Sequence, residues 1–231
     1  MINFSEFENK TGIVFSDKSL LSQSFTHRSY INENGGVKNG HNERLESLGD
    51  AVLELITTDY LYKAYPGNNE GELTAYRSAL VNAIIISEVA SQIGMNEYLL
   101  LSKGEAKDTG KARSYILANT YEAYLGAVYL DQGYDVAKKF VEDTLIPRLD
   151  EIVSKKLWRD PKSLVQEKAQ EIYKTTPLYK VISENGPDHD KHFTIAIFFG
   201  DEEIARGKGK SKQEAEQAAA SSAIEAKGWN D

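Results

Sequence analysis

The chain has 231 residues, of which 41% are hydrophobic and 27% charged, and its formal net charge is −8. This composition is typical of a globular protein with one large domain or two small ones, and the lack of cysteine excludes disulfides and thiolate metal sites. The sequence shows neither a signal peptide nor an apolar run of membrane-spanning length, so we expect a cytoplasmic protein with no membrane partner.

The N-terminal two thirds of the chain carries apolar residues at three- and four-residue steps, a spacing that predicts helices. The expected helices are residues 17–25, 43–65, 70–94, 114–133 and 135–157. Glycine, proline and asparagine lie between them, where helices end. We find no convincing strand or internal repeat here and predict an all-α domain over residues 1–154.

A short charged segment, residues 155–160, is interpreted as a linker to a second domain over residues 161–231. Asp160 and Pro161 suit the cap and first position of a helix over 160–174. Runs rich in β-branched and aromatic residues then predict strands. These strands are expected at residues 177–186, 192–200 and 202–210.

Turn and cap signals complete this second unit. Gly200 and Asp201 suit a tight hairpin turn between the last two strands. Ser211 and Glu214 predict a capping box at the start of a final helix that ends at Gly228. The predicted order is therefore α-β-β-β-α, a small α+β domain.

Four acids lie on one side of the predicted helix 43–65. At roughly 100° per residue they fall within about one quarter of the helix circumference. The four are Glu43, Glu46, Asp50 and Glu54. Two carboxylates about 5 Å apart repel by roughly 3 kcal/mol at an effective dielectric near 20. The stripe is therefore either a solvated acidic face or part of a cation site.

A second helix offers matching ligands. Asn119 and Glu122 stand three residues apart on one face of the otherwise apolar helix 114–133. Two helices that each present oxygen ligands can form a divalent-ion cage, whether catalytic or structural. Oxygen ligands without cysteine or clustered histidine favour Mg²⁺ or Mn²⁺ over Zn²⁺. We therefore predict a metal site between these two helices.

The motifs around these acids resemble those of a known family. Residues 42–53, NERLESLGDAVL, closely resemble the ribonuclease III signature, and three further segments match its surroundings in order. These are THRSY, NEGELTAYRSALV and ILANTYEAYLGAVYLDQG. The second unit resembles the double-stranded-RNA-binding domain that follows the nuclease domain in bacterial members. The resemblance covers essentially the whole chain and implies a multidomain protein, an all-α endonuclease domain plus a small α+β RNA-binding domain.

This resemblance implies an endoribonuclease that hydrolyses double-stranded RNA with Mg²⁺, for which Mn²⁺ can substitute. It also implies a homodimer whose two sites each cut one strand, leaving 5′-phosphates and short 3′ overhangs. Processing of ribosomal and messenger RNA precursors is the implied role.

The resemblance also assigns residues. It implies that Asp50 and Glu122 are catalytic and that Glu46 and Asn119 join them as metal ligands. It places two auxiliary acids, Glu43 and Glu70, beside the cleavage site. Glu54 has no family role and is expected to be a solvated neighbour.

Two positions depart from the family pattern. Asn119 stands where the family most often has aspartate. Asparagine keeps a carbonyl oxygen as a ligand but lacks the negative charge, so the affinity for a cation should be lower. Ser47 stands where the family usually has a phenylalanine that packs across the dimer interface.

The expected RNA-binding residues lie in the second unit. Gln166, on the polar side of its first helix, can hydrogen-bond in a minor groove, and His189, in a loop between strands, can reach the next one. The expected phosphate contacts are Lys191, Lys208, Lys210 and Lys212, the last of which opens the final helix. Gln213 occupies a position where the family usually has a second lysine. The alternatives are a solvated loop for the lysines and a turn residue for His189.

Other residues are less decisive. Three cations, Arg77, Lys111 and Arg113, either touch phosphates or are ordinary surface charge. His27 is expected to be structural. The tyrosines at positions 121, 124 and 129 fit core or interface packing better than base stacking.

Two rival functions remain. A catalytically weakened RNA-binding protein is motivated by Asn119. A metallo-phosphohydrolase of the His-Asp type has only His189 and Asp190 in its favour, and they lie in the other domain.

Overall fold

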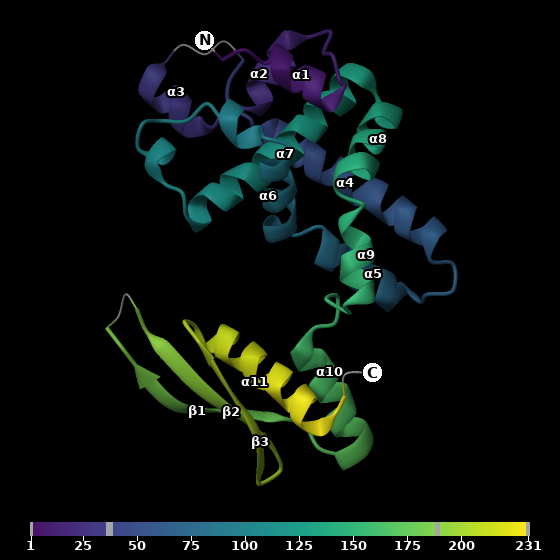
Figure 1. Cartoon of the computed structure of the whole chain (residues 1–231), viewed down its shortest axis with the longest axis vertical. Helices are drawn as coiled ribbons and strands as arrows, with labels where there is room; N and C mark the ends of the chain where they lie inside the picture. Colours follow the sequence, from purple (N-terminus) through teal and green to yellow (C-terminus); the bar gives the residue numbers. More distant parts are fainter. Residues whose placement is uncertain (1, 36–38, 188–189, 230–231) are drawn as a thin grey trace. The chain divides into compact units, whose positions relative to one another are not determined.

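The computed structural model describes residues 2–35, 39–187 and 190–229 (Figure 1). Contacts within the chain divide it into two compact units, one ending at Trp158 and the other beginning at Arg159. This division falls inside the segment predicted to be a linker.

The N-terminal unit is helical. Its α-helices are α1 (Ser5–Thr11), α2 (Lys18–Ser24), α3 (Arg28–Asn34), α4 (Glu43–Ala64), α5 (Glu70–Leu80), α6 (Ala83–Gln92), α7 (Lys111–Gln132), α8 (Tyr134–Thr144) and α9 (Arg148–Ser154), with 3-10 turns at Met95–Tyr98 and Glu105–Lys107. Outside the helices, an isolated bridge pairs Thr26 with Leu100, and the described part of this unit contains no strand. The predicted all-α class is confirmed.

Two of the predicted helices are broken in the structure. The expected helix 70–94 is interrupted because the Asn82 side chain caps a new helix, with its Oδ1 accepting from the backbone N–H groups of Ile84 and Ile85 at 3.1 Å each. The expected helix 135–157 is interrupted at Pro147, which has no N–H to donate. Among the described residues, no single helix is long and apolar enough to cross a membrane. Helices α5 and α6, which are bent by 48° where they join, reach the required length and composition only when they are taken together.

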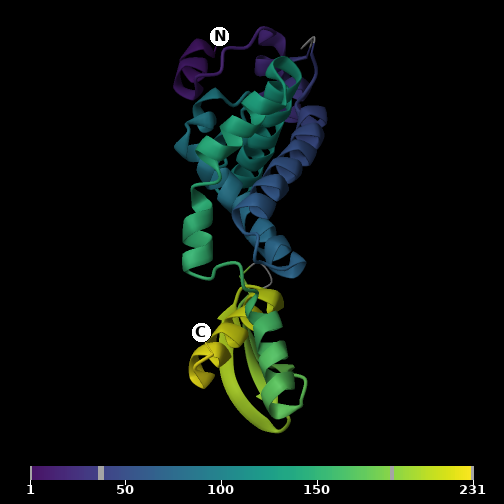
Figure 2. The same ribbon diagram turned by 90° about the vertical axis from the view of Figure 1, so that its right-hand side faces the viewer.

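Helices α4 and α7 lie side by side in the centre of this unit (Figures 1 and 2). Tyr121 and Tyr124 of α7 are fully buried, and their hydroxyls lie 2.8 Å from Thr144 Oγ1 and 3.1 Å from Thr11 Oγ1. The expected packing role of these two tyrosines is confirmed. Tyr129, near the end of α7, lies at the surface.

Two glycines let the backbones of α4 and α7 meet. A Cβ at Gly49 would overlap the carbonyl oxygen of Glu122, and a Cβ at Gly126 would overlap that of Leu45. Any side chain at either position would force the helices apart. Gly49, in the segment NERLESLGDAVL, therefore fixes how closely the two acid-bearing helices approach.

The C-terminal unit has the predicted α-β-β-β-α order. Its elements are α10 (Pro161–Lys168), which continues as a π-turn over Ala169–Tyr173, then β1 (Leu178–Asn185), β2 (His192–Phe199), β3 (Glu202–Gly209) and α11 (Lys212–Lys227). The strands form an antiparallel sheet in the order β1-β2-β3, and both helices cover the same face (Figure 1). Val165 and Ala219 of the helices pack there against Ile197 and Phe199 of β2.

The predicted turn and caps of this unit are largely present. Gly200 adopts a left-handed conformation, with φ of 62°, between β2 and β3. Ser211 Oγ accepts from the Glu214 N–H at 3.1 Å, but the Glu214 carboxylate accepts from the N–H of Lys210 at 2.8 Å. The predicted capping box is therefore only half formed, because β3 ends at Gly209 and leaves the Lys210 N–H outside the strand ladder.

Candidate active site

A pocket of about 240 Å³ opens where the start of α4 meets α7. Glu43 and Glu46 of α4 line it together with Asn119 of α7. Its wall is completed by His27, Arg28, Asn42 and Ile116. Three of the sequence-predicted site residues, from two helices, thus share one pocket.

Asn42 fixes the start of α4 at this pocket. The residue is buried, its N–H donates to the carbonyl of Thr26 at 2.9 Å, and its Nδ2 donates to the carbonyl of Ser24 at 3.1 Å. Its own carbonyl accepts the N–H of Glu46 at 2.9 Å. The first turn of α4 is therefore tied to the end of α2, which holds Glu46 at the pocket.

The carboxylates of the two helices influence one another. Burial raises the pKa of Glu122, and the negative charges of Asp50 and Glu46 raise it further, to about 7. Burial also raises the pKa of Glu46, with added repulsion from Glu43 and Asp50. The backbones of the two helices meet at Gly49 and Glu122, beside Asp50, and this close approach accounts for the mutual effect of the charges. The carboxylates of Glu46, Asp50 and Glu122 thus occupy one electrostatic environment.

This donor set fits a hard divalent cation, although the acids do not form a tight cage. Over the described ranges, no three His, Asp or Glu side chains gather closely enough to enclose a metal ion. Glu46 and Asn119 line the pocket, whereas Asp50 and Glu122 are not among its lining residues. As a candidate donor set, the three carboxylates and the amide oxygen of Asn119 have the ligand chemistry of Mg²⁺ or Mn²⁺. The raised pKa of Glu122 comes first from burial and then from the charges of Asp50 and Glu46, and a cation would offset that second part.

Glu43 and Glu70 lie at opposite ends of α4. Glu43 lines the pocket, where its carboxylate lies 3.6 Å from the guanidinium of Arg28. Glu70 follows the other end of α4, a 22-residue helix about 30 Å long. Its carboxylate accepts from the Thr74 hydroxyl at 3.4 Å. Within one chain, Glu70 does not reach the pocket.

Glu54 is not merely a solvated neighbour. Its carboxylate pairs with Arg77 Nε at 2.9 Å, and Arg77 also donates to Thr58 Oγ1 at 2.9 Å. Arg77 therefore braces α5 against α4, a contact between distant segments that the helical periodicity could not reveal. Arg113 likewise donates to the backbone carbonyls of Glu105 and Ala106, at 2.9 and 3.1 Å. Both arginines thus have structural contacts within the nuclease unit that neither predicted role, phosphate contact or ordinary surface charge, included, whereas Lys111 is exposed at the start of α7.

His27 has the structural role expected of it. Its Nδ1 accepts from the backbone N–H of Ser29 at 3.3 Å and lies 2.8 Å from the Ser29 hydroxyl, so it caps α3. Burial lowers its pKa. Its place in the wall of the acidic pocket was not predicted, although the match of THRSY to the family motif was a signal.

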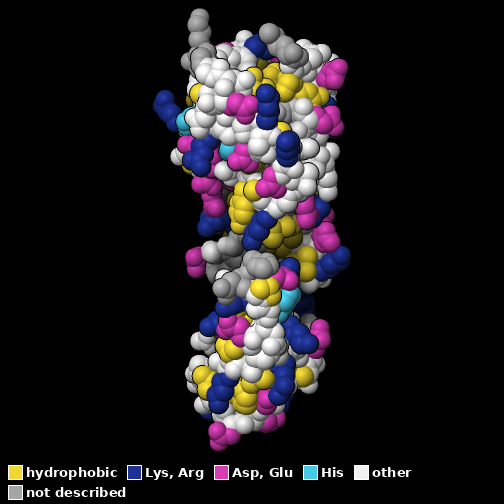
Figure 3. Space-filling view, turned by 90° about the vertical axis from the view of Figure 1, so that its left-hand side faces the viewer, with side chains coloured by type: hydrophobic (Ala, Val, Ile, Leu, Met, Phe, Trp, Pro, Cys, Tyr) yellow, Lys and Arg dark blue, Asp and Glu magenta, His cyan; other side chains and the backbone are white. Residues whose placement is uncertain are grey.

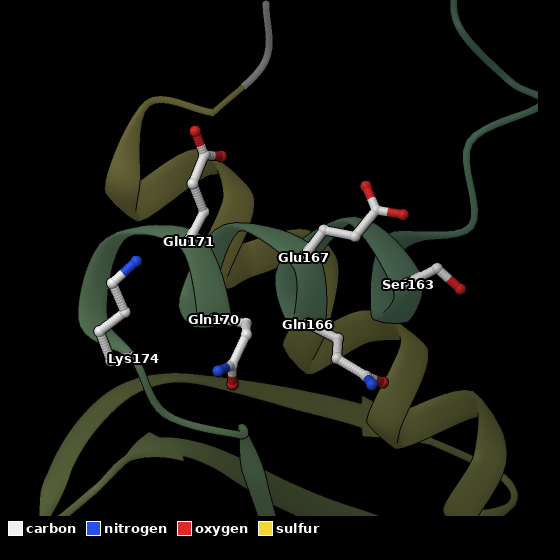
Figure 4. Close-up of a pocket in the computed structure, with 6 residues that line it drawn as sticks. All are labelled: Ser163, Gln166, Glu167, Gln170, Glu171 and Lys174. Carbon is white, nitrogen blue, oxygen red and sulfur yellow. The ribbon is translucent and has the colours of Figure 1, made fainter.

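The outer face of α10 carries the predicted minor-groove residue. Gln166 is exposed beside Gln170, and both side chains project from the same side of the helix (Figure 4). The surrounding groove is completed by Ser163, Glu167, Glu171 and Lys174. Gln170 was missed in the sequence, although its spacing four residues after Gln166 places it on the same face.

The predicted phosphate-binding lysines differ in their surroundings. Lys191 pairs with Glu184 at 2.8 Å, and Lys210 lies 3.4 Å from Asp190. Lys212 Nζ lies 5.8 Å from the centre of the Phe193 ring, and Lys208 is exposed on β3. His189 lies outside the described residues. Acidic and basic side chains are interspersed on the face shown in Figure 3, so phosphate must compete locally with carboxylates.

Comparisons with known proteins agree with both halves of this fold. Residues 17–149 match the Ribonuclease-III-like family model, and residues 161–227 match that of the Double-stranded RNA binding motif. A Ribonuclease 3 from Protochlamydia amoebophila is 46% identical to the chain, over 94% of the chain and 89% of that relative. The chain belongs to the ribonuclease III family. Another family member, Ribonuclease 3 from Enterococcus faecalis, is 43% identical over 95% of each chain.

Solved structures of the family match the N-terminal unit. The nuclease domain of ribonuclease III from Campylobacter jejuni is 34% identical, with a TM-score of 0.57, over 64% of this chain and 97% of that domain. A second structure of that nuclease domain gives a TM-score of 0.56 at 35% identity, over 61% of this chain and 94% of that one. The fold and family expected from the motifs are confirmed.

Proposed function

We propose that this member of the ribonuclease III family is an endonuclease that hydrolyses double-stranded RNA with divalent metal ions. It would leave 5′-phosphates and short 3′ overhangs while processing precursors of ribosomal and messenger RNA. One observation carries the proposal: Glu46 of α4 and Asn119 of α7 line one pocket where the two helices meet, in a chain that also carries a double-stranded RNA binding motif.

Each residue of the acidic site has a distinct task in this proposal. Glu46, Asp50 and Glu122 would hold Mg²⁺ or Mn²⁺ through carboxylate oxygens, and Asn119 through its amide oxygen. The bound ions would supply an activated water and neutralise charge on the phosphate. The crossing of α4 and α7 fixes the spacing of the ligands. Asp50 and Glu122 are the two residues we propose to be indispensable.

The C-terminal unit would hold the duplex by its shape. Gln166 of α10 and Gln170 of the π-turn that continues it project from one exposed side and would hydrogen-bond in a minor groove, whose 2′-hydroxyls distinguish RNA from DNA. Lys208, Lys210 and Lys212 would contact phosphates near the start of α11. Because Lys210 is paired with Asp190, RNA binding exchanges a carboxylate partner for a phosphate.

A homodimer is part of the proposal. One of the two Campylobacter jejuni structures is described as showing structural flexibility in a region involved in dimer formation of that nuclease domain. In this chain Glu70 lies at the far end of α4 from the acidic pocket, so it would serve such a site only from a second copy. Sedimentation equilibrium tests the dimer, and a monomer at all accessible concentrations would refute it.

The central test is cleavage of a long RNA duplex in Mg²⁺ or Mn²⁺, with the product ends mapped. We expect staggered cuts with 5′-phosphates and no cutting of a DNA duplex of the same sequence. Glu122→Gln should abolish cleavage while leaving duplex binding largely intact. Substantial turnover by that variant, or intact duplex in both metals with the parent protein, would overturn the proposal.

The rival functions gain no support from the described residues. Asn119 lines the acidic pocket with a ligand oxygen retained, so its presence does not favour a protein that only binds RNA. Asp190 lies 3.4 Å from Lys210 and 3.5 Å from His192, which makes it a surface ion-pair partner in the RNA-binding unit. The cleavage assay separates all three functions.

A further inference from the structure

The chain leaving the nuclease unit is folded back onto that unit immediately after α9. The N–H of Leu157 donates to the carbonyl of Ile152 at 2.9 Å, and the N–H of Lys156 donates to that of Val153 at 3.2 Å. Lys156 adopts a left-handed conformation, with φ of 53°. These two bonds form a Schellman motif, which stops the helix in a defined direction. A non-glycine residue in this conformation persists only where its surroundings hold it there.

Trp158 provides the next fixed point. Its ring packs edge-on against Tyr76 of α5, with centroids 5.0 Å apart and planes at 76°. Tyr76 is buried, packs in turn against Tyr65 at 5.2 Å, and its hydroxyl accepts from Asn68 Nδ2 at 3.2 Å. Trp158 therefore packs against the hydrophobic core of the nuclease unit. Edge-to-face aromatic contacts of this kind have a preferred geometry as well as buried area.

The RNA-binding unit begins almost at once. The Asp160 side chain caps α10 by accepting from the Ser163 N–H at 2.8 Å, so Asp160 is already part of that unit. Arg159 alone separates it from Trp158. With Trp158 docked, the tether spans two peptide steps, at most about 7 Å. With Trp158 released and the end of α9 frayed back to Ser154, it spans six steps, or about 20 Å.

We propose that Trp158 is a positioning residue that sets the length of the tether between the two units by docking on Tyr76. This inference rests on the proposed function. Once a tether is longer than the span it must bridge, the effective concentration at which it presents a bound duplex to the acidic site falls roughly as the −3/2 power of its length. Lengthening the tether from two steps to between three and six therefore lowers that concentration about two- to fivefold.

The test compares cleavage of long and short duplexes by the full-length Trp158→Ala variant. For a duplex long enough to engage both units, we expect kcat/KM to fall about two- to fivefold. For a duplex much shorter than the roughly 16 base pairs that the RNA-binding unit spans, we expect no change, because its cleavage does not use the tether. A purely structural defect would lower both values together.

Two matched variants sharpen this comparison. Leu157→Ala removes a side chain of the same segment that is 58% exposed. It should leave kcat/KM unchanged for both the long and the short duplex. Trp158→Phe keeps an aromatic ring and should restore most of the long-duplex activity. The inference is refuted if Trp158→Ala lowers kcat/KM for the short duplex. It is also refuted if Trp158→Ala and the parent protein have equal kcat/KM for the long duplex.

Fluorescence tests the docking without relying on cleavage. The chain has two tryptophans, so Trp229→Phe leaves Trp158 as the only one. Docked Trp158 should be quenched by acrylamide much less than in urea, and adding Tyr76→Ala should make it readily quenched. Equal quenching in the folded and unfolded protein refutes the docking. Failure of the parent protein to cut any duplex instead refutes the proposed function, and the two failures are therefore distinguishable.

Discussion

Replacing Glu122 by glutamine should stabilise the metal-free protein while abolishing cleavage. The folded state raises the pKa of Glu122 from 4.5 to about 7, through burial and the charges of Asp50 and Glu46. A raised folded-state pKa means that the folded protein binds this proton more tightly than the unfolded chain does. The resulting stabilisation is fully present below pH 4.5 and is lost as the pH rises through about 7.

The size of the change in free energy of unfolding follows from the shift in the pKa of Glu122. One pKa unit corresponds to about 1.4 kcal/mol, so a shift from 4.5 to about 7 sets an upper limit of about 3.5 kcal/mol. Glu122 is partly exposed, and solvent screening reduces this to about 2 kcal/mol. Glutamine matches glutamate in size but carries no charge. The variant should therefore gain about 2 kcal/mol in free energy of unfolding above about pH 8, and almost nothing near pH 4.

Urea denaturation with a metal chelator, followed by helical circular dichroism, measures this gain at the two pH values. Adding Mg²⁺ should stabilise the parent protein more than the glutamine variant, because the variant has lost one carboxylate ligand and its share of the repulsion that a cation relieves. Glu54→Gln is the matched control, since Glu54 lies on the same side of α4 but is paired with Arg77. It should show no gain at high pH. If Glu122→Gln were less stable than the parent above about pH 8, the account of a carboxylate destabilised by burial and like-charge repulsion would be refuted.

Three further predictions concern packing, metal affinity and RNA binding. Gly49→Ala should destabilise the protein by about 3 kcal/mol or more in a thermal or urea melt, because its Cβ overlaps the Glu122 carbonyl, whereas Gly67→Ala has open space and should not. Asn119→Asp should lower the Mg²⁺ concentration for half-maximal cleavage several-fold in a metal titration, since it adds a charged ligand to the pocket; an unchanged titration would argue against Asn119 as a ligand. Lys208→Ala should weaken duplex binding, measured by fluorescence anisotropy, and reduce the slope of log affinity against log salt concentration by about one. If the affinity of the parent protein does not change with added salt, the assignment of Lys208 as a phosphate contact is contradicted.

The helices and strands of this fold were mostly predictable, because apolar periodicity follows from burial on one face. The periodicity failed where a local cap competed with it. Apolar steps run without interruption across 70–94, yet Asn82 can cap only a helix that starts after it, so the chain bends there. The strands of the second unit were easier, since β-branched and aromatic runs lie between clear turn residues.

The acidic site was predictable only in part. The stripe on α4 follows from helical spacing, but its partner on α7 lies about seventy residues away, and no periodicity pairs two particular helices. The family resemblance supplied that pairing. Contacts made by tertiary folding alone, such as Glu54 with Arg77 or Trp158 with Tyr76, leave no trace in local sequence patterns.

The packing of α4 against α7 explains why repulsion among the acids persists in the fold. Carboxylates that repel one another can separate if their helices slide apart, but here the backbones touch at Gly49 and Gly126. The buried Tyr121 and Tyr124 hold α7 to α8 and α1 through their hydroxyl contacts, so α7 is fixed from its other side as well. Protonation of Glu122 and cation binding are then two ways to relieve the repulsion without moving the helices. At neutral pH and above, Glu122 is increasingly deprotonated. Because the helices hold the carboxylates in place, binding of a cation is then favoured.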